Sequence, residues 1–184
     1  MDEQQLIDGV KNRDRSSQRI LYERFAPSML SVCFRYLNDY EAARDVLQEG
    51  FIKIFNSLDS YQNKGSFEGW IRRIFINVCL EQLRKNDVLK NAALIDDPCV
   101  MIEPDYSALD QISADELMEI ITELPPGFRT VFNMYAIEGY SHKEIGDILG
   151  ITESTSRSQF TRAKQQLQKK LKDLYQINYR DYEK

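Results

Sequence analysis

GYSHKEIGDILGITESTSRSQFTRAKQQLQKKL, residues 139–171, decides how the C-terminal part of the chain folds. Ser141 and Glu144 have the spacing of a capping box, in which a serine hydroxyl and a glutamate carboxylate each accept a hydrogen bond from a free N–H group at a helix start. Gly150 suits the left-handed conformation that ends such a helix. Thr152 can cap a second helix, and apolar residues recur three or four positions apart from Phe160 onward. The stretch therefore predicts a helix-turn-helix.

The second of these helices is strongly basic. Between Glu153 and Lys172 there are six basic residues and one acidic residue, whereas the whole chain has a net charge of −5. The second helix of a helix-turn-helix can enter the major groove of DNA. The alternative is a solvated amphipathic helix without a partner. The capping box, the glycine turn and the basic helix together favour contact with DNA.

The composition is that of an ordinary soluble protein, with 42% apolar and 29% charged residues among 184. The chain contains no run of about 18 apolar residues, and its start, MDEQQLIDGVKNRD, is too polar for a secretion signal. Cys33, Cys79 and Cys99 are odd in number and widely spaced, which suits a reducing cytosol and predicts neither a disulfide framework nor a zinc site. We therefore expect a cytoplasmic protein, with Cys33 and Cys79 buried in helices.

The sequence offers little to an enzyme. It contains no cluster of metal-binding His and Cys, no phosphate loop and no pairing of a nucleophile with a base. The single histidine, His142, lies inside the capping box and is expected to be a surface contact rather than a catalyst. We expect no enzymatic activity, no cofactor and no bound metal.

The charge is distributed unevenly along the chain. Residues 61–90 hold six basic and three acidic side chains, residues 91–127 hold nine acidic ones and no Lys or Arg, and residues 128–184 hold ten basic and seven acidic ones. Few glycines and prolines and long stretches of helical periodicity indicate an all-α fold. We predict two small helical domains, residues 1–87 and 113–184, joined by a flexible acidic linker, residues 88–112.

Helix signals subdivide both domains. One helix is expected over residues 16–25, with Pro27 in the first turn of the next. Asp39 can cap the helix that follows, and Ser66 can cap a long helix over residues 67–85. Ser113 begins a second capping box, which starts a helix that continues to about residue 124.

Five segments, taken in order, resemble the extracytoplasmic-function (ECF) sigma factors, the minimal two-domain subunits of bacterial transcription initiation. They are DVLQEGF at 45–51, FEGWIRRI at 67–74, NVCLEQLRK at 77–85, LPPGFRTVF at 124–132 and IEGYSHKEI at 137–145. The chain departs from the family pattern at Glu81, where aspartate is common, at Ser156, where an apolar residue is usual, and at Gln159, where a basic residue is frequent. The last two departures bear on which promoter is read.

The resemblance implies that Asp45, Gln48 and Glu49 dock on a coiled coil of core RNA polymerase, with Phe51 packing behind them. The physical pattern agrees, because the three polar side chains share the helix face opposite the apolar stripe. The alternative is a solvated helix face.

The resemblance also implies that the loop at 62–66 and the helix at 67–85 capture the melted −10 element. Single-stranded DNA requires cations for phosphates and polar or aromatic groups for bases. We expect base contacts from Asn63, Lys64 and Asn77, and phosphate contacts from Arg73, Arg84 and Lys85. Whether Trp70 packs in the core or stacks on a base is left open, although its spacing favours the core.

In the helix-turn-helix, the resemblance implies recognition of the −35 promoter element. The residues expected in the groove are Ser154, Thr155, Arg157, Ser158 and Gln159, with Arg162 and Lys164 on phosphates. The acidic linker would thread the channel through which nascent RNA leaves, or would serve as a solvated spacer.

The partners implied are core RNA polymerase, promoter DNA and an anti-sigma factor, and we expect a monomer when free, with no membrane insertion. A conventional helix-turn-helix regulator that acts without polymerase is the alternative. It would explain residues 139–171 but not the patterns at 45–51 and 67–85.

Overall fold

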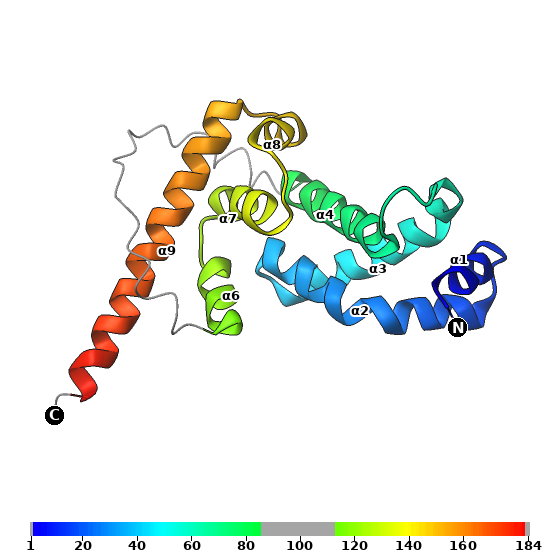
Figure 1. Ribbon diagram of the computed structural model, residues 1–184, viewed down its shortest axis with the longest axis horizontal. Coiled ribbons are helices and arrows are strands. Elements are labelled where there is room, and N and C mark those ends of the chain that lie inside the picture. Colours follow the sequence, from blue (N-terminus) through cyan, green and yellow to red (C-terminus); the bar gives the residue numbers. More distant parts are fainter. Residues whose placement is uncertain (1, 86–112, 183–184) are drawn as a thin grey trace. The chain divides into compact units, whose positions relative to one another are not determined.

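The computed structural model describes residues 2–85 and 113–182, and every regular element among them is a helix (Figure 1). The chain divides into two compact units, Met1–Asn86 and Asp87–Lys184. The predicted all-α fold with two helical domains is confirmed. The acidic linker expected at residues 88–112, together with Cys99, lies outside the described residues.

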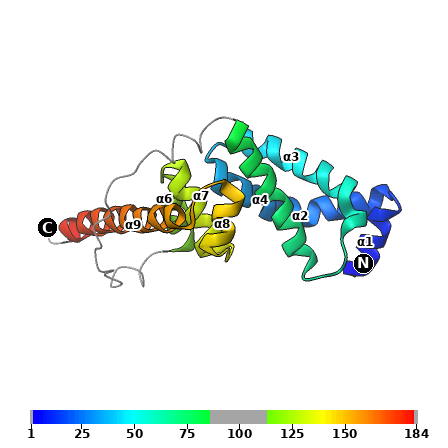
Figure 2. The same cartoon turned by 90° about the horizontal axis from the view of Figure 1, so that it is seen from above.

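The N-terminal unit contains α1 (Glu3–Lys11), α2 (Arg15–Leu37), α3 (Tyr40–Ser57), the short 3-10 helix η1 (Leu58–Ser60) and α4 (Phe67–Lys85). Helices α2, α3 and α4 pack against one another, and α1 packs against the start of α2 (Figure 2).

Short polar side chains set where these helices begin. The Asp39 carboxylate accepts from the backbone N–H of Ala42 at 3.0 Å, and the Ser66 hydroxyl accepts from that of Gly69 at 3.1 Å, as the sequence predicts. Asn38 ends α2 in the left-handed conformation, with φ 52°.

The helix break expected near Pro27 is wrong, because α2 continues through it from Arg15 to Leu37. Proline cannot donate the hydrogen bond to the carbonyl four residues earlier, which normally weakens a helix interior. Here Phe25, Ala26 and Met29 are all buried on either side of the proline. We infer that this packing holds the helix together, whereas Pro27 itself faces solvent.

Aromatic side chains fill the centre of the N-terminal unit. Phe67 contacts Phe25 edge-on with ring centroids 5.9 Å apart, and Phe75 contacts Phe51 in the same way at 5.3 Å. Gly50 provides the space for Phe75, since a Cβ at residue 50 would lie 2.2 Å from the Phe75 ring. The core thus fixes α3 and α4 against each other.

The C-terminal unit contains α6 (Ala114–Thr122), α7 (Pro126–Phe132), a π-helical turn η3 (Asn133–Ile137), α8 (His142–Leu149) and α9 (Glu153–Tyr182). The second capping box is confirmed, since Ser113 and Glu116 exchange both of its hydrogen bonds. A core of aliphatic residues and Phe128 joins α6 and α7 to α9; its buried members are Ile120, Ile121, Leu124, Phe128, Ala163, Leu167 and Leu171.

Arg129 ties α6 to α7 from inside this unit. Its side chain is only 4% exposed, and one guanidinium nitrogen donates to the carbonyl oxygens of Thr122 at 2.6 Å and Leu124 at 3.1 Å. These carbonyls lie at the C-terminal end of α6, where no helical N–H group follows to bond them. Helix α6 therefore ends two residues earlier than the sequence predicts, in a turn that the arginine closes.

Candidate polymerase and nucleic-acid interfaces

The proposed polymerase-binding residues lie together on the outer face of α3. Asp45 and Gln48 are exposed and Glu49 is half-buried, whereas Ala43 and Val46 on the opposite face are buried. The structure shows no hydrogen bond or ion pair from Asp45 or Gln48 to another described residue. Their acceptor groups are therefore available to a basic partner.

Glu49 is connected to α4 through Lys53. The Lys53 ammonium lies 3.3 Å from a carboxylate oxygen of Glu49 and 2.6 Å from one of Glu81 on α4. The hydrogen bond to Glu81, with a smaller contribution from Glu49, raises the pKa of Lys53. The bridge joins two residues that are 28 positions apart, so no local pattern in the sequence predicts it.

The residues proposed for the −10 element come from the loop before α4 and from its outer side. Asn63 adopts a left-handed conformation with φ 55°, and both Asn63 and Lys64 are exposed. The Tyr61 hydroxyl donates to the Gly65 carbonyl at 3.1 Å and holds the loop closed. The four helix residues of this set are also exposed: Arg73, Asn77, Arg84 and Lys85.

Trp70 lies at the edge of the aromatic core. Its ring stacks on Phe67, with centroids 6.0 Å apart and planes 11° from parallel, and contacts Tyr61 at 5.4 Å. Phe67 and Tyr61 are buried, but Trp70 is only partly so. The side chain therefore packs on the core with one part of its surface still exposed.

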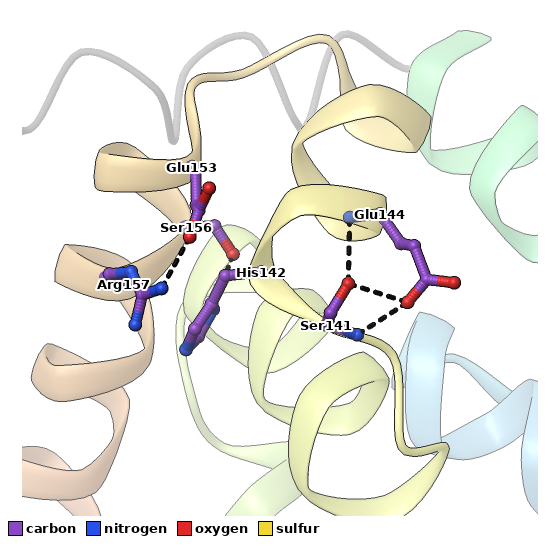
Figure 3. Close-up of polar contacts among 6 residues, drawn as sticks. All are labelled: Ser141, His142, Glu144, Glu153, Ser156 and Arg157. Atoms are coloured by element: carbon purple, nitrogen blue, oxygen red, sulfur yellow. Dashed lines mark hydrogen bonds and ion pairs between the residues drawn. The ribbon is translucent and has the colours of Figure 1, made fainter.

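The helix-turn-helix is formed by α8, α9 and the turn between them (Figure 3). The Ser141 hydroxyl accepts from the Glu144 N–H at 3.2 Å, and the Glu144 carboxylate accepts from the Ser141 N–H at 2.8 Å. Gly150 ends α8 with φ 70°, and Thr152 caps α9 by accepting from the Thr155 N–H at 3.0 Å. The motif expected from residues 139–171 is confirmed in its local detail.

Most of the residues expected to contact the −35 element have at least part of their side chain exposed on α9. Ser154, Arg157 and Lys164 are exposed, and Thr155, Ser158 and Arg162 are half-buried. Arg157 pairs with Glu153 at 2.5 Å, and the Lys164 ammonium lies 5.1 Å from the centroid of the Phe160 ring.

Gln159 is the exception. The expected contact with the DNA groove requires an exposed side chain, and the structure buries this residue. The residue is only 6% exposed and has an interaction partner within the structure, so in the free protein it does not lie on the exposed surface of α9. It lies four residues before buried Ala163 and eight before buried Leu167, on the helix face that packs inward. Extending that apolar spacing one turn back would have placed Gln159 inside.

His142 and Ser156 join α8 to α9 from within. His142 Nδ1 lies 3.0 Å from the Ser156 hydroxyl, and the two residues are 7% and 0% exposed (Figure 3). The imidazole also stacks on Tyr135, with centroids 4.1 Å apart and planes 8° from parallel. The expected surface role of His142 is therefore wrong. Ser156 is an interior residue, so it reaches no base edge directly.

The electrostatics of this contact favour a neutral imidazole. Burial lowers the pKa of His142 from its ordinary value of 6.5, nearby Arg157 lowers it further, and Glu153 acts in the opposite direction. A neutral ring leaves one nitrogen able to accept a hydrogen bond from the serine hydroxyl, or to donate one to it in the other tautomer.

The described residues, 2–85 and 113–182, also bear on the expectations for metal sites, cysteines and membrane helices. They contain no group of three or more His, Cys, Asp or Glu placed to hold a metal ion. Cys33 and Cys79 are buried free thiols, as expected, and the pKa of Cys79 is raised by its hydrogen bond to Cys33 and by burial. None of the helices described is both long and apolar enough to cross a membrane.

Comparison with known proteins gives the same division of the chain. Residues 21–88 match the family model of Sigma-70 region 2, and residues 114–167 match that of Sigma-70 region 4. The ECF RNA polymerase sigma factor SigE of Mycolicibacterium smegmatis is 34% identical over 151 residues, which cover 80% of this chain and 58% of that protein. SigW of Bacillus subtilis is 25% identical over 188 residues, covering 91% of this chain and 96% of SigW.

Among solved structures, the sigma factor RpoE in complex with the anti-sigma factor NepR from Bartonella quintana has the same fold. Its TM-score is 0.52 at 19% sequence identity, covering 84% of this chain and 96% of that one. The two family models fall on the two helical units, and the relatives align along most of this chain. The chain therefore belongs to the ECF sigma factors, the family of transcription initiation factors that direct RNA polymerase to promoters.

Proposed function

We propose that the N-terminal unit binds core RNA polymerase through the outer face of α3, with Asp45, Gln48 and Glu49 as the contacts. The observation that supports this most directly is that Asp45 and Gln48 are exposed on one face and have no partner among the described residues. Glu49 shares Lys53 with Glu81, so a basic group of the polymerase would compete with Lys53 for it. Because the Lys53 and Glu49 side chains are both partly exposed, at 38% and 41%, the loss of this ion pair costs the free protein little.

We infer further that α4 and the loop before it hold the melted −10 element. Asn63, Lys64 and Asn77 contact bases, and Arg73, Arg84 and Lys85 contact phosphates; all six are exposed. The position of Asn63 supports this, because it is exposed in the middle of a loop that the hydrogen bond from Tyr61 to Gly65 closes.

For the −35 element we propose Ser154, Thr155, Arg157 and Ser158 as base contacts, with Arg162 and Lys164 on phosphates. Arg157 is paired with Glu153 in the free protein, but both side chains are largely exposed, at 63% and 47%. An exposed pair of this spacing is worth about 0.3–0.5 kcal/mol, so the guanidinium can exchange it for a guanine at little cost. Gln159 is left out because it is buried.

We also propose where the protein acts, its oligomeric state and its regulation, from its membership of the family. The protein acts in the cytoplasm, where core polymerase and DNA are found, as a monomer without cofactor or enzymatic activity. An anti-sigma factor holds it inactive, which is suggested by the solved relatives: RpoE is bound to NepR, and CnrH to the cytosolic domain of CnrY.

The test of the polymerase interface is the double variant Asp45→Ala/Glu49→Ala. Losing charged contacts at an interface costs about 2–5 kcal/mol when they are desolvated, so we expect at least tenfold weaker binding to core polymerase. The control is Glu3→Ala/Glu23→Ala, which removes two exposed carboxylates from α1 and α2 with the same change in net charge. Equal affinity of the two double variants would remove the assignment.

A further inference from the structure

Ile52 is the most exposed of the large apolar side chains described, at 59%. It lies in the middle of α3, where the buried residues Ala43, Phe51 and Ile54 form the inner face. An isolated exposed isoleucine is not unusual in itself. Its position relative to the proposed polymerase contacts makes it informative.

Ile52 belongs to the same helix face as those contacts. It follows Asp45 by seven residues and Gln48 by four, and such spacings place side chains in one row along a helix. Ala43, fully buried, lies nine residues earlier and therefore on the opposite side. The exposed row on α3 thus begins with the polar residues Asp45 and Gln48 and continues with the apolar Ile52.

The Ile52 side chain contributes little to the stability of the free protein. Most of its surface is in water, so its burial contributes little to stability. A β-branched residue in a helix also has a lower helix propensity than alanine. The free domain would be at least as stable with a smaller residue at this position.

We propose that Ile52 is the apolar anchor of the polymerase-binding face, one turn beyond Gln48 and Glu49 in the row that begins at Asp45, and that it is covered when core RNA polymerase binds. This inference rests on the function proposed above for α3 and names a further contact in that interface. Interfaces of this kind combine a desolvated apolar centre with a polar rim. The matching surface on the polymerase would present an apolar side chain flanked by basic ones.

The experiment measures binding of the 184-residue chain to core polymerase for five proteins: the unchanged chain, the three single variants below and Asp45→Ala/Glu49→Ala. Ile52→Ala removes the side chain beyond Cβ, so we expect about tenfold weaker binding, and Ile52→Leu should restore most of the affinity. Tyr40→Ala is the matched control, because Tyr40 is 55% exposed on the same helix but about a third of a turn away from the row. Its affinity should equal that of the unchanged protein.

Urea unfolding followed by the fluorescence of Trp70, the single tryptophan, checks that the N-terminal unit is intact in each variant. Ile52→Ala should unfold at the same urea concentration as the unchanged protein or a higher one. Full affinity of Ile52→Ala, alongside weak binding by Asp45→Ala/Glu49→Ala, would overturn the role of Ile52 and leave the interface in place. Full affinity of both would overturn the whole α3 interface.

Discussion

The buried contact between His142 and Ser156 yields a quantitative prediction for the helix-turn-helix. Ser156→Ala removes the hydroxyl that lies 3.0 Å from His142 Nδ1 and leaves a ring nitrogen unpaired in a site that is only 7% exposed. A buried polar atom without its partner costs about 1–3 kcal/mol. Because small domains are marginally stable, that is a large share of the stability of the C-terminal unit.

A double-mutant cycle isolates this pair. His142→Phe keeps a ring to stack on Tyr135, and Ser156→Val supplies an apolar side chain in place of the hydroxyl. Each single change leaves one polar group unpaired, whereas the double change leaves none. We expect the double variant to be more stable than the sum of the single effects by about 1 kcal/mol or more.

Hydrogen–deuterium exchange of peptides from α8 and α9 in the full-length chain measures these effects, since local opening of the motif exposes their amides. The fluorescence of Trp70, which belongs to the N-terminal unit, is the internal control. Single effects below about 0.5 kcal/mol that add without coupling would refute a structural role for the contact.

Three further predictions concern stability. Gly50→Ala places a Cβ 2.2 Å from the Phe75 ring and should destabilise the N-terminal unit by about 1–3 kcal/mol, measured by urea unfolding with tryptophan fluorescence. Arg129→Met leaves buried carbonyl oxygens unpaired and should cost the C-terminal unit about 1–3 kcal/mol, seen as faster amide exchange in α6 and α7; unchanged exchange would contradict it. The third prediction concerns pH. The pKa of His142 is lowered in the folded protein by burial and by Arg157, so as pH falls the imidazole of the unfolded chain is protonated before that of the folded chain. The stability that depends on the neutral ring is fully present above about pH 6.5 and is lost as pH falls towards the lower pKa, and His142→Phe should flatten this part of the pH profile.

The features that the sequence predicted best are those determined by neighbouring residues. The capping boxes at Ser113 and Ser141, the cap at Asp39 and the left-handed Gly150 depend on the residue itself and on groups three or four positions away, and all are present. The exposed row of Asp45 and Gln48 followed from helical periodicity alone.

The features that it missed depend on contacts distant in sequence. Pro27 lies inside a helix because the buried residues around it outweigh its local preference. The bridge from Lys53 to Glu81 joins two helices whose relative placement no local pattern specifies.

His142 and Gln159 were misplaced for a different reason. His142 was expected at the surface because it lies inside the capping box, and Gln159 in the groove because of the family resemblance, although each lies three or four residues from a buried position on its own helix. A polar side chain within an apolar stripe is often buried with a hydrogen-bonding partner. In this structure His142 and Ser156 are such partners. The spacing of these residues from buried positions on the same helix indicates their burial correctly, whereas their polarity does not.

The central claim is that this chain binds core RNA polymerase and directs it to promoters. The most direct measurement is transcription from a library of promoter fragments by core polymerase, with and without the purified chain, followed by sequencing of the RNA 5′ ends. The account predicts a new set of start sites that share two upstream elements and that are lost with Asp45→Ala/Glu49→Ala. An unchanged set of start sites, with duplex DNA still bound by the chain, would contradict it and favour a regulator that acts without the polymerase.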